Sequence, residues 1–404
     1  MSDPIQAWSD DVRNLTPDQA KLVSESKLLS VELEEPPNRW RLVANSRIGI
    51  VQGDDWEIRV VPRIAIPKLM FLLSYAADSN GWRDSIAGFG EEEDLFSGVA
   101  NGFALLAQRA LEPAPLRGYT EVDELSQAFR GRLRVADQMA RTLPLPLEIN
   151  YDDYTIDTQE NRIILSATEL LLRFPWIPER ARRMLLRIRA RLDGVQARLA
   201  TLTEIPITRL NRKYGPALKL ASLIMAGSSI TTSYGKTKST SFVFDMNRVF
   251  EDFLSVALTD ALRRHGGRVA TQYQGKHLDD ERQIKLIPDI TWWKNGKLRG
   301  LVDAKFKALT DSRFPNADAF QMLAYCSALS LPSGYLVYAH GGNERPGNHT
   351  VTSAGVKIKV RTVDVAKSPK ELLERIDLLA DEISADTPAI ANSSSKILGS
   401  VPSV

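Results

Sequence analysis

The sequence predicts an α+β protein of several domains: a β-rich N-terminal domain with helices, a helical middle segment, and a C-terminal α/β unit with a mixed sheet. Three observations support this prediction. Short β-rich runs precede Ile66, apolar residues recur at helical spacing between Thr158 and Gly227, and helices alternate with strands after Phe242. The 404 residues are enough for roughly two to four domains.

The composition is that of an ordinary water-soluble protein, with 43% hydrophobic and 25% charged residues. Lys and Arg number 52 and Asp and Glu 50, so a net charge of +2 leaves no global field that would attract nucleic acid. A single cysteine, Cys326, excludes a disulfide framework and a cysteine-rich zinc site. Residues 1–10 lack a secretory signal, and no stretch is apolar enough to span a bilayer. We therefore expect a cytoplasmic protein.

The N-terminal part alternates short strands with helices. We expect a small β-meander, with a turn at 53–55, from strands at 41–44, 47–51 and 56–61. We expect helices at 68–77, ending near Asn80, and at 94–111. Residues 121–129 fit either a strand followed by a turn or a short helix. Pro144 and Pro146 then interrupt the chain, and we place a domain boundary shortly after them.

The middle of the chain is helical and locally basic. Residues 158–227 predict three or four helices. The stretch 173–213 holds 11 basic and 3 acidic residues. Such a run is usually a solvated helix face, and contact with nucleic acid is the alternative. The Ser- and Thr-rich stretch 228–241 predicts a loop or linker.

The last third predicts one α/β unit, which begins at Phe242. The expected elements, in order, are a helix at 244–264, strands at 269–273, 285–293 and 297–306, a helix at 317–329, a strand at 334–339 and a late strand at 356–363. The end, 385–404, is rich in Ser, Ala and Pro and predicts disorder.

The most informative stretch is a predicted hairpin that carries acidic residues. Asn295-Gly296 between two β-rich runs favours a two-residue type I′ turn, which makes the two strands antiparallel neighbours. In that register Asp303 faces Pro288, and Asp289 lies one step away. Asp303 and Lys305 share one face of their strand. Asp289 would join them only through a bulge or distortion, which Pro288 could cause, so we expect an irregular strand at Pro288.

Two carboxylates and an ammonium group at one strand edge suit a hydrolytic metal site. Carboxylate oxygens of Asp289 and Asp303 would hold Mg²⁺, and Lys305 would orient a water molecule or stabilise developing charge. The alternative is an exposed hairpin whose Asp and Lys form a surface ion pair worth about 0–1 kcal/mol.

Three further residues could belong to this site. Glu251, on the predicted helix before the strands, could supply another carboxylate, or it could lie on a solvated face. Gln321 and Tyr325 are four residues apart on the next predicted helix and share one face. They could hydrogen-bond the site or DNA, or Tyr325 could be a half-buried core residue.

These motifs together resemble two known groups of proteins. Pro288-Asp289, Asp303-Ala304-Lys305 and the later Gln321-X-X-X-Tyr325 resemble the PD-(D/E)xK nuclease superfamily. The runs that begin at Phe244, Val61 and Gln159 make the chain similar to the McrC family, the nuclease subunits of McrBC modification-dependent (type IV) restriction systems. The resemblance spans roughly residues 40–365.

The resemblance implies a Mg²⁺-dependent endonuclease of antiviral defence that works with an McrB-type AAA+ GTPase hexamer. This chain would stimulate GTP hydrolysis and cleave double-stranded DNA that contains 5-methylcytosine, in complexes that could pair. Asp289, Asp303, Lys305, Glu251, Gln321 and Tyr325 would form the catalytic site, and Asp289, Asp303, Glu251 and the main chain of Ala304 would hold the metal. The partner would bind the GTP, since the stretch that ends in Gly235-Lys236-Thr237 lacks the first glycine of a phosphate-binding loop.

The predicted domains follow from this resemblance. They are a β-rich partner-docking domain at 1–155, a helical connector at 156–235, a PD-(D/E)xK endonuclease domain at 236–384 and a disordered tail at 385–404. Two other functions stay open at this point. The chain could be a non-catalytic activator of an NTPase ring, or a stand-alone repair-type nuclease that needs no partner.

Overall fold

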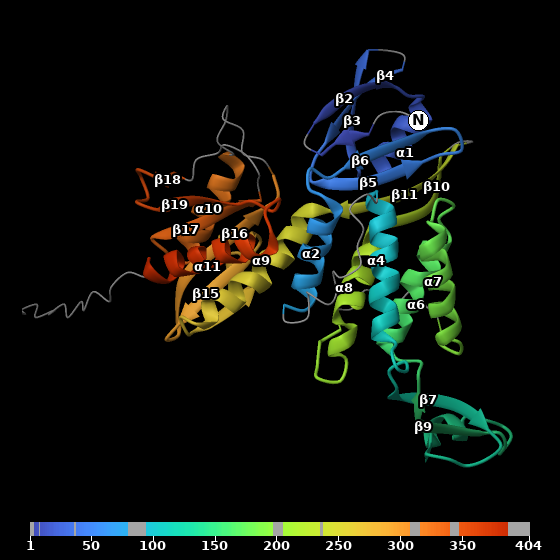
Figure 1. Cartoon of the computed structure of the whole chain (residues 1–404). Helices are drawn as coiled ribbons and strands as arrows, with labels where there is room; N and C mark the ends of the chain where they lie inside the picture. The colour runs from blue at the N-terminus through green and yellow to red at the C-terminus, as the bar shows by residue number, and fades with distance from the viewer. Residues whose placement is uncertain are drawn as a thin grey trace, which may run out of the picture.

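A computed structural model of the chain describes residues 4–7, 9–35, 38–79, 94–196, 205–234, 237–307, 316–339 and 347–386. It shows an N-terminal β part above a bundle of helices, a small β module that protrudes from the bundle, and a C-terminal α/β unit to one side (Figure 1). The mixed α+β class predicted from the sequence is confirmed.

The N-terminal part contains two sheets and one helix. The five-stranded sheet has the order β1 (Ile5–Gln6), β6 (Glu57–Val61), β5 (Arg47–Gln52), β11 (Thr237–Asp245) and β10 (Ser228–Tyr234). The three-stranded sheet has the order β2 (Asp10–Asn14), β4 (Arg39–Ala44) and β3 (Leu29–Glu35). Helix α1 (Pro17–Glu25) begins with a capping box in which Thr16 accepts the amide of Gln19.

Two predictions for these strands are wrong. The expected meander over 41–61 does not form, because β4 belongs to the three-stranded sheet whereas β5 and β6 belong to the other. The expected loop at 228–241 contains the paired strands β10 and β11, and β11 pairs antiparallel with β5. The five-stranded sheet therefore joins residues on both sides of the predicted boundary at 235/236.

The helical bundle confirms the helices predicted for this region, with small shifts at their ends. Its members are α2 (Ile66–Ala77), α4 (Leu95–Ala110), α6 (Gln159–Leu172), α7 (Glu179–Arg191), the 3₁₀ turn η1 (Arg212–Tyr214) and α8 (Gly215–Gly227). Helix α2 ends at Ala77, and the end predicted near Asn80 lies outside the described residues. One large apolar core runs through the bundle and continues to the C-terminal unit.

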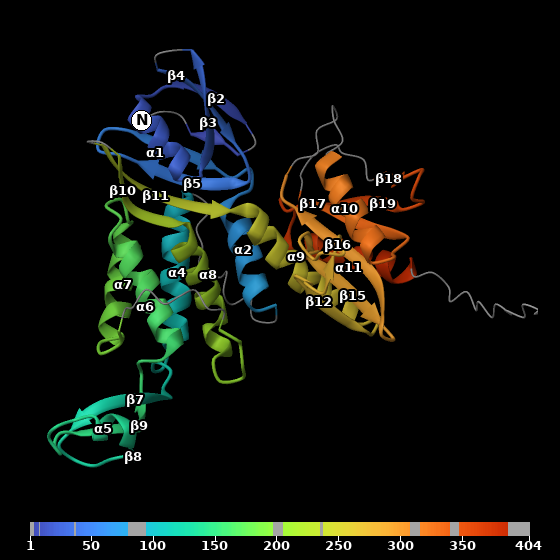
Figure 2. The same cartoon turned by 180° about the vertical axis from the view of Figure 1, so that it is seen from behind.

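A small β module extends from the lower end of the bundle, away from both other parts (Figure 2). It consists of β7 (Gly118–Ser126), β8 (Arg132–Leu133), α5 (Val135–Met139) and β9 (Leu147–Thr155). Its strand order is β7-β9-β8, and the two long strands pair over their whole length. Of the two structures expected for 121–129, the strand followed by a turn is confirmed.

The C-terminal unit contains a six-stranded mixed sheet. Its order is β12 (Arg268–Thr271), β15 (Ile290–Lys294), β16 (Lys297–Lys305), β17 (Ser333–Ala339), β19 (Lys357–Val363) and β18 (Gly347–Thr350). A short ribbon, β13 (Lys276–His277) with β14 (Lys285–Leu286), lies beside it. The helices of the unit are α9 (Met246–Arg263), α10 (Asn316–Ala328) and α11 (Pro369–Ala385). Helices α9 and α11 contribute to the large core, whereas α10 packs in a separate core beneath β17 and β19.

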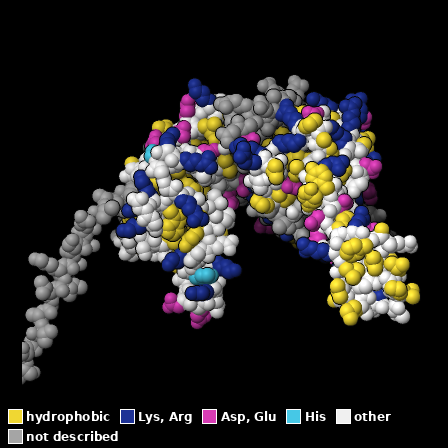
Figure 3. All heavy atoms as spheres, turned by 90° about the horizontal axis from the view of Figure 1, so that it is seen from below, with side chains coloured by type: hydrophobic (Ala, Val, Ile, Leu, Met, Phe, Trp, Pro, Cys, Tyr) yellow, Lys and Arg dark blue, Asp and Glu magenta, His cyan; other side chains and the backbone are white. Residues whose placement is uncertain are grey.

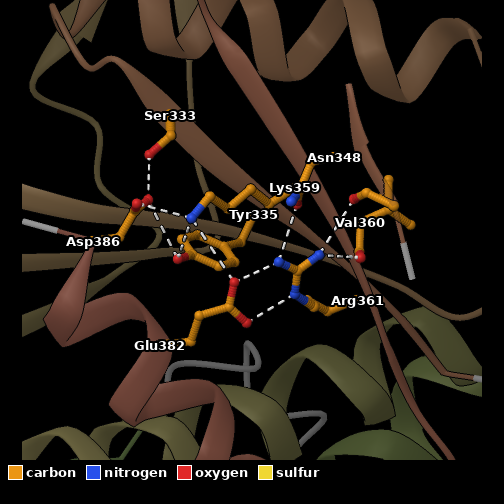
Figure 4. Close-up of polar contacts among 9 residues, drawn as sticks. Ser333, Tyr335, Asn348, Lys359, Val360, Arg361, Glu382 and Asp386 are labelled. Carbon is orange, nitrogen blue, oxygen red and sulfur yellow. Dashed lines mark hydrogen bonds and ion pairs between the residues drawn. The ribbon is translucent and has the colours of Figure 1, made fainter. Parts of the chain in front are cut away.

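Helix α11 was not among the elements expected from the sequence, and a charged network fixes it to the sheet (Figure 4). Arg361 of β19 binds the Glu382 carboxylate through two nitrogens, one of them at 2.8 Å. Lys359 of the same strand contacts Asp386 at 2.8 Å, and the Ser333 hydroxyl donates to Asp386 at 2.7 Å. The helix ends at Ala385, which is the first residue of the predicted disordered tail. Residues 387–404 of that tail lie outside the described residues.

Candidate active site

The candidate site is built on the hairpin of β15 and β16, whose turn forms as predicted. Asn295 and Gly296 have φ values of +53° and +72°, as a type I′ turn requires. The strands pair Lys294 with Lys297 at the tip, and then the register shifts between Trp292 and Trp293.

The register shift places the two acidic residues opposite each other. Arg299 is the extra residue of this bulge, so that Trp292 pairs with Gly300 and Ile290 with Val302. Continued by one step, this register puts Asp289 opposite Asp303 and on the same face, not one step away as predicted. The strand is also interrupted at 287–289, so the irregularity expected at Pro288 is present. The bulge that changes the register, however, lies nearer the turn, and its extra residue belongs to β16 and not to the strand that contains Pro288.

Both carboxylates are buried. Asp289 is 9% exposed and Asp303 2% exposed. The Asp289 Oδ2 atom accepts the backbone N–H of Ala304 at 2.8 Å, which brings the main chain of Ala304 into the site. Burial, followed by the charges of Asp303 and Glu251, raises the pKa of Asp289 to about 8. Burial also raises the pKa of Asp303, although Lys305 acts in the opposite direction. Burial and mutual repulsion therefore disfavour the charged forms of the two carboxylates, and the positive group beside them, Lys305, compensates them only in part.

Lys305 lies between the carboxylates and α10. Its Nζ atom is 2.7 Å from Asp303 Oδ2 and donates to Gln321 Oε1 at 3.0 Å. Burial by itself lowers the pKa of Lys305, but Asp303 and Asp289 outweigh burial and raise it. The ammonium group therefore stays charged.

A chain of hydrogen bonds continues from Lys305 across α10. Gln321 Nε2 donates to the Tyr325 hydroxyl at 2.9 Å, and this hydroxyl donates to the backbone oxygen of Ile287 at 3.1 Å. Tyr325 is 5% exposed. The structure thus brings the predicted pair Gln321 and Tyr325 to the site, where they hold Lys305 and the chain segment just before Asp289.

Glu251 reaches the site through another residue. Gln272 Nε2 donates to Glu251 Oε1, and the same nitrogen is 3.4 Å from Asp289 Oδ1. Burial, followed by the charge of Asp252, raises the pKa of Glu251. Among the described residues, no group of three or more His, Cys, Asp or Glu side chains is placed to hold a metal ion. Asp289 and Asp303 are therefore the two predicted carboxylates that converge directly, and Glu251 stands beside them.

Several residues near the site were missed by the sequence analysis. Asn247, at the start of α9, donates to Ser46 Oγ of the N-terminal part at 2.7 Å and accepts the backbone N–H of Phe306 at 3.0 Å. The buried Asp318 of α10 binds Lys307 at 2.6 Å and accepts the Tyr338 hydroxyl at 2.6 Å. The spacing held a signal for Asp318, because it lies three residues before Gln321 and so shares its helix face.

The fold and the site define a class of protein: a multi-part α+β chain that carries a buried carboxylate pair and a lysine on the sheet of its C-terminal unit. Residues 42–339 match the family described as "McrBC 5-methylcytosine restriction system component". This match covers well over half of the chain. The chain therefore belongs to the McrBC family, which confirms the resemblance found in the sequence.

The fold of the chain can be compared with solved structures. The chain is similar to one in the refined half-complex from the tetradecameric assembly of Thermococcus gammatolerans McrB AAA+ hexamers with bound McrC. The TM-score is 0.55 and the identity 16%, over 94% of this chain and 100% of that chain. A cryo-EM structure of the Thermococcus gammatolerans McrBC complex matches with a TM-score of 0.40 and 18% identity, over 64% of this chain and 88% of that chain. No curated protein sequence matches at a significant level.

The structure also bears on the single cysteine and on membrane-spanning helices. Cys326 is a buried small residue, 1% exposed, and burial raises the pKa of its thiol to about 12. Among the described residues, no helix has both the length and the apolar character that a bilayer crossing requires.

Proposed function

We propose that this chain is the nuclease subunit of a McrBC-type restriction system and that it hydrolyses phosphodiester bonds of DNA with Mg²⁺. The observation that supports this proposal is the buried, opposed pair Asp289 and Asp303 with Lys305 in ion-pair contact. These residues are the Pro-Asp and Asp-X-Lys of the PD-(D/E)xK pattern, which we assign to residues 236–384.

The residues at the site suit a divalent cation. Asp303 Oδ2 is buried and, within the described part of the chain, makes no hydrogen bond beyond its ion-pair contact with Lys305. A cation would stabilise the ionised forms of both buried carboxylates. Mg²⁺ commonly takes one or two protein carboxylates and completes its shell with waters and phosphate oxygens, so a third direct carboxylate is not required.

Asp289, Asp303 and the backbone carbonyl of Ala304 would hold the ion, and Glu251 would act beside them through Gln272. When bound, Mg²⁺ would polarise the phosphodiester and acidify a water molecule. Lys305 would orient the attacking water and stabilise charge that develops on the phosphate. Gln321 and Tyr325 would position Lys305.

We also propose that the module at 118–155 docks this chain onto an McrB-like AAA+ GTPase hexamer and stimulates its GTP hydrolysis. Apolar side chains gather on the surface of this module, which Figure 3 shows at the lower right. The exposed residues include Tyr119 (77%), Phe129 (64%), Met139 (80%) and Leu143 (66%). Monomeric proteins rarely expose so many apolar side chains together, and such patches mark interaction sites. This assignment narrows the predicted docking domain, 1–155, to its protruding end.

Cleavage of plasmid DNA tests the nuclease proposal. Methylated and unmethylated plasmid would be incubated with Mg²⁺ and this chain, with and without the partner GTPase and GTP. Wild-type chain should cut methylated plasmid only in the complete mixture, and D303N or K305M should abolish cutting while GTPase stimulation persists. Stimulation without cutting by the wild type would leave a non-catalytic activator, and cutting without the partner would indicate a stand-alone nuclease.

The docking module has its own test. M139D/L143D should remove GTPase stimulation, because two charges in the centre of an apolar contact would have to be desolvated. L378D, at an apolar residue of α11 that is 59% exposed, is the matched control and should leave stimulation intact. Normal stimulation by M139D/L143D would refute docking through this module.

A further inference from the structure

Helix α7 carries a concentration of positive charge that the proposed nuclease site does not use. Six arginines and one glutamate lie within its 13 residues, which gives a net charge of +5 against +2 for the whole chain. The arginines are Arg180, Arg182, Arg183, Arg187, Arg189 and Arg191. Ala181, Leu185 and Ile188 are buried against the bundle, so the arginines occupy the outer faces of the helix.

Little within the described chain neutralises this charge. The ion pair on this helix joins Arg183 to Glu179 at 3.9 Å, and both side chains are about two-thirds exposed. Arg191 donates to the backbone oxygen of Pro113 at 2.9 Å. Arg180, Arg187 and Arg189 make no ion pair with any residue that the structure describes. A surface pair of this kind is worth about 0–1 kcal/mol, so the charges remain available to a ligand.

The spacing of the arginines suits a regular polyanion. Arg180, Arg183, Arg187 and Arg191 follow one another at three or four residues, which places them in one stripe along the helix. A helix of this length is about 20 Å long, and one DNA strand presents about six phosphates over that distance. The planar guanidinium group binds phosphate oxygens through two hydrogen bonds.

The position of α7 separates this stripe from the nuclease site. Both views of the chain show α7 on the outer side of the helical bundle, on the opposite side from the C-terminal unit (Figures 1 and 2). A duplex that lies along α7 would therefore be held at a second place, away from Asp289 and Asp303.

We propose that the outer face of α7 binds the phosphate backbone of DNA without reading its sequence. The proposal rests on the proposed function in one respect, namely that DNA is the substrate. Charge complementarity supports it, since a local charge of +5 on an almost neutral chain attracts polyanions to this helix. Contact with an acidic surface of the protein partner is the competing outcome of the test.

The salt dependence of DNA binding tests this proposal. The full-length chain would be titrated onto a fluorescent duplex of about 30 base pairs, with EDTA present so that cleavage plays no part, at several salt concentrations between about 50 and 200 mM. The test variant is R180Q/R183Q/R187Q. The control, K21Q/R39Q/K370Q, removes the same number of exposed positive charges from other surfaces. R180K/R183K/R187K keeps the charge of α7.

Each phosphate contact contributes about 0.9 to the slope of log K against log salt. The test variant should therefore lower that slope by up to about 2.7 and weaken binding at least about tenfold, whereas the control should change binding less than about twofold. The lysine variant should keep most of the slope.

Three results would overturn the proposal. The first is an equal loss of binding in the test variant and the control, and the second is unchanged binding in both. The third is a test variant that binds DNA normally but no longer stimulates the partner GTPase, which would assign α7 to the protein partner. A wild-type chain that binds DNA through α7 and never cuts it would refute the nuclease proposal alone.

Discussion

The stability of the chain should fall with rising pH because of Asp289, and the Asn variant should lose this dependence. The pKa of Asp289 is raised in the folded chain to about 8, mainly by burial, from 3.8. Between these two values the folded chain keeps a proton that the unfolded chain has released. Unfolding then releases the proton, so the free energy of unfolding decreases as pH rises. An acid whose pKa is lowered in the folded chain would instead make the free energy of unfolding increase as pH rises.

The magnitude follows from one proton. Each pH unit within this window changes the free energy of unfolding by about 1.4 kcal/mol, so wild-type chain should lose about 2 kcal/mol between about pH 6 and pH 7.5 relative to D289N. Asp289 is 9% exposed, so solvent screening reduces this value little. Asparagine retains a carbonyl oxygen that can accept the N–H of Ala304, so the main chain should stay in place.

Urea unfolding in EDTA measures this difference. Trp292, which is 2% exposed, and Trp293 lie on β15 directly after Asp289, so tryptophan fluorescence includes a signal from the C-terminal unit. D54N, at an exposed acidic residue of the N-terminal part, is the control and should follow the wild type. Mg²⁺ should reduce the pH dependence of the wild type if Asp289 is a ligand. Equal pH dependence of wild type and D289N would show that Asp289 is not held protonated and would refute the reasoning.

Two further substitutions test the packing that supports the site. Y325F removes the hydroxyl that accepts from Gln321 and donates to the Ile287 carbonyl, so the free energy of unfolding should fall by about 1–2 kcal/mol. Urea titration measures this change. An unchanged midpoint would show that neither hydrogen bond contributes to stability. In G300A the new Cβ would lie 2.7 Å from Ile383 Cγ2, and the chain should lose about 1–3 kcal/mol. The double variant G300A/I383A should relieve this clash, and a thermal melt of G300A that matches wild type would contradict it.

Local signals in the sequence predicted much of the C-terminal unit. The Asn295-Gly296 turn, the helix expected at 244–264 and the shared face of Gln321 and Tyr325 all depend on neighbouring residues, and the structure contains each of them. Helix α11 has a comparable signal, although it was not among the predicted elements. Ser368 caps the helix and Glu371 completes a capping box, a pattern that is visible in the sequence.

Pairings between distant segments were the part that local signals could not supply. Strand β11 pairs with β5 although roughly 190 residues separate them, as in the pair of Phe242 and Ile50. The Ser- and Thr-rich composition of 228–241 favours a loop when it is considered alone. The edge of β5 that does not pair with β6 offers backbone hydrogen-bond partners, and these partners turn the segment into a strand. The composition of the segment alone does not reveal them. The same limit explains why β4 and β5 were placed in one meander.

The bulge at Arg299 determines which side chains meet at the site. In the register set by the turn alone, Asp303 would face Pro288, and Asp289 would point to the opposite face of the sheet. One extra residue in β16 reverses this and brings the carboxylates together. Gly300, next to the bulge, lies against Ile383 of α11, where no larger residue fits. A helix that carries none of the predicted site residues therefore packs directly against the part of β16 whose bulge places Asp289 opposite Asp303.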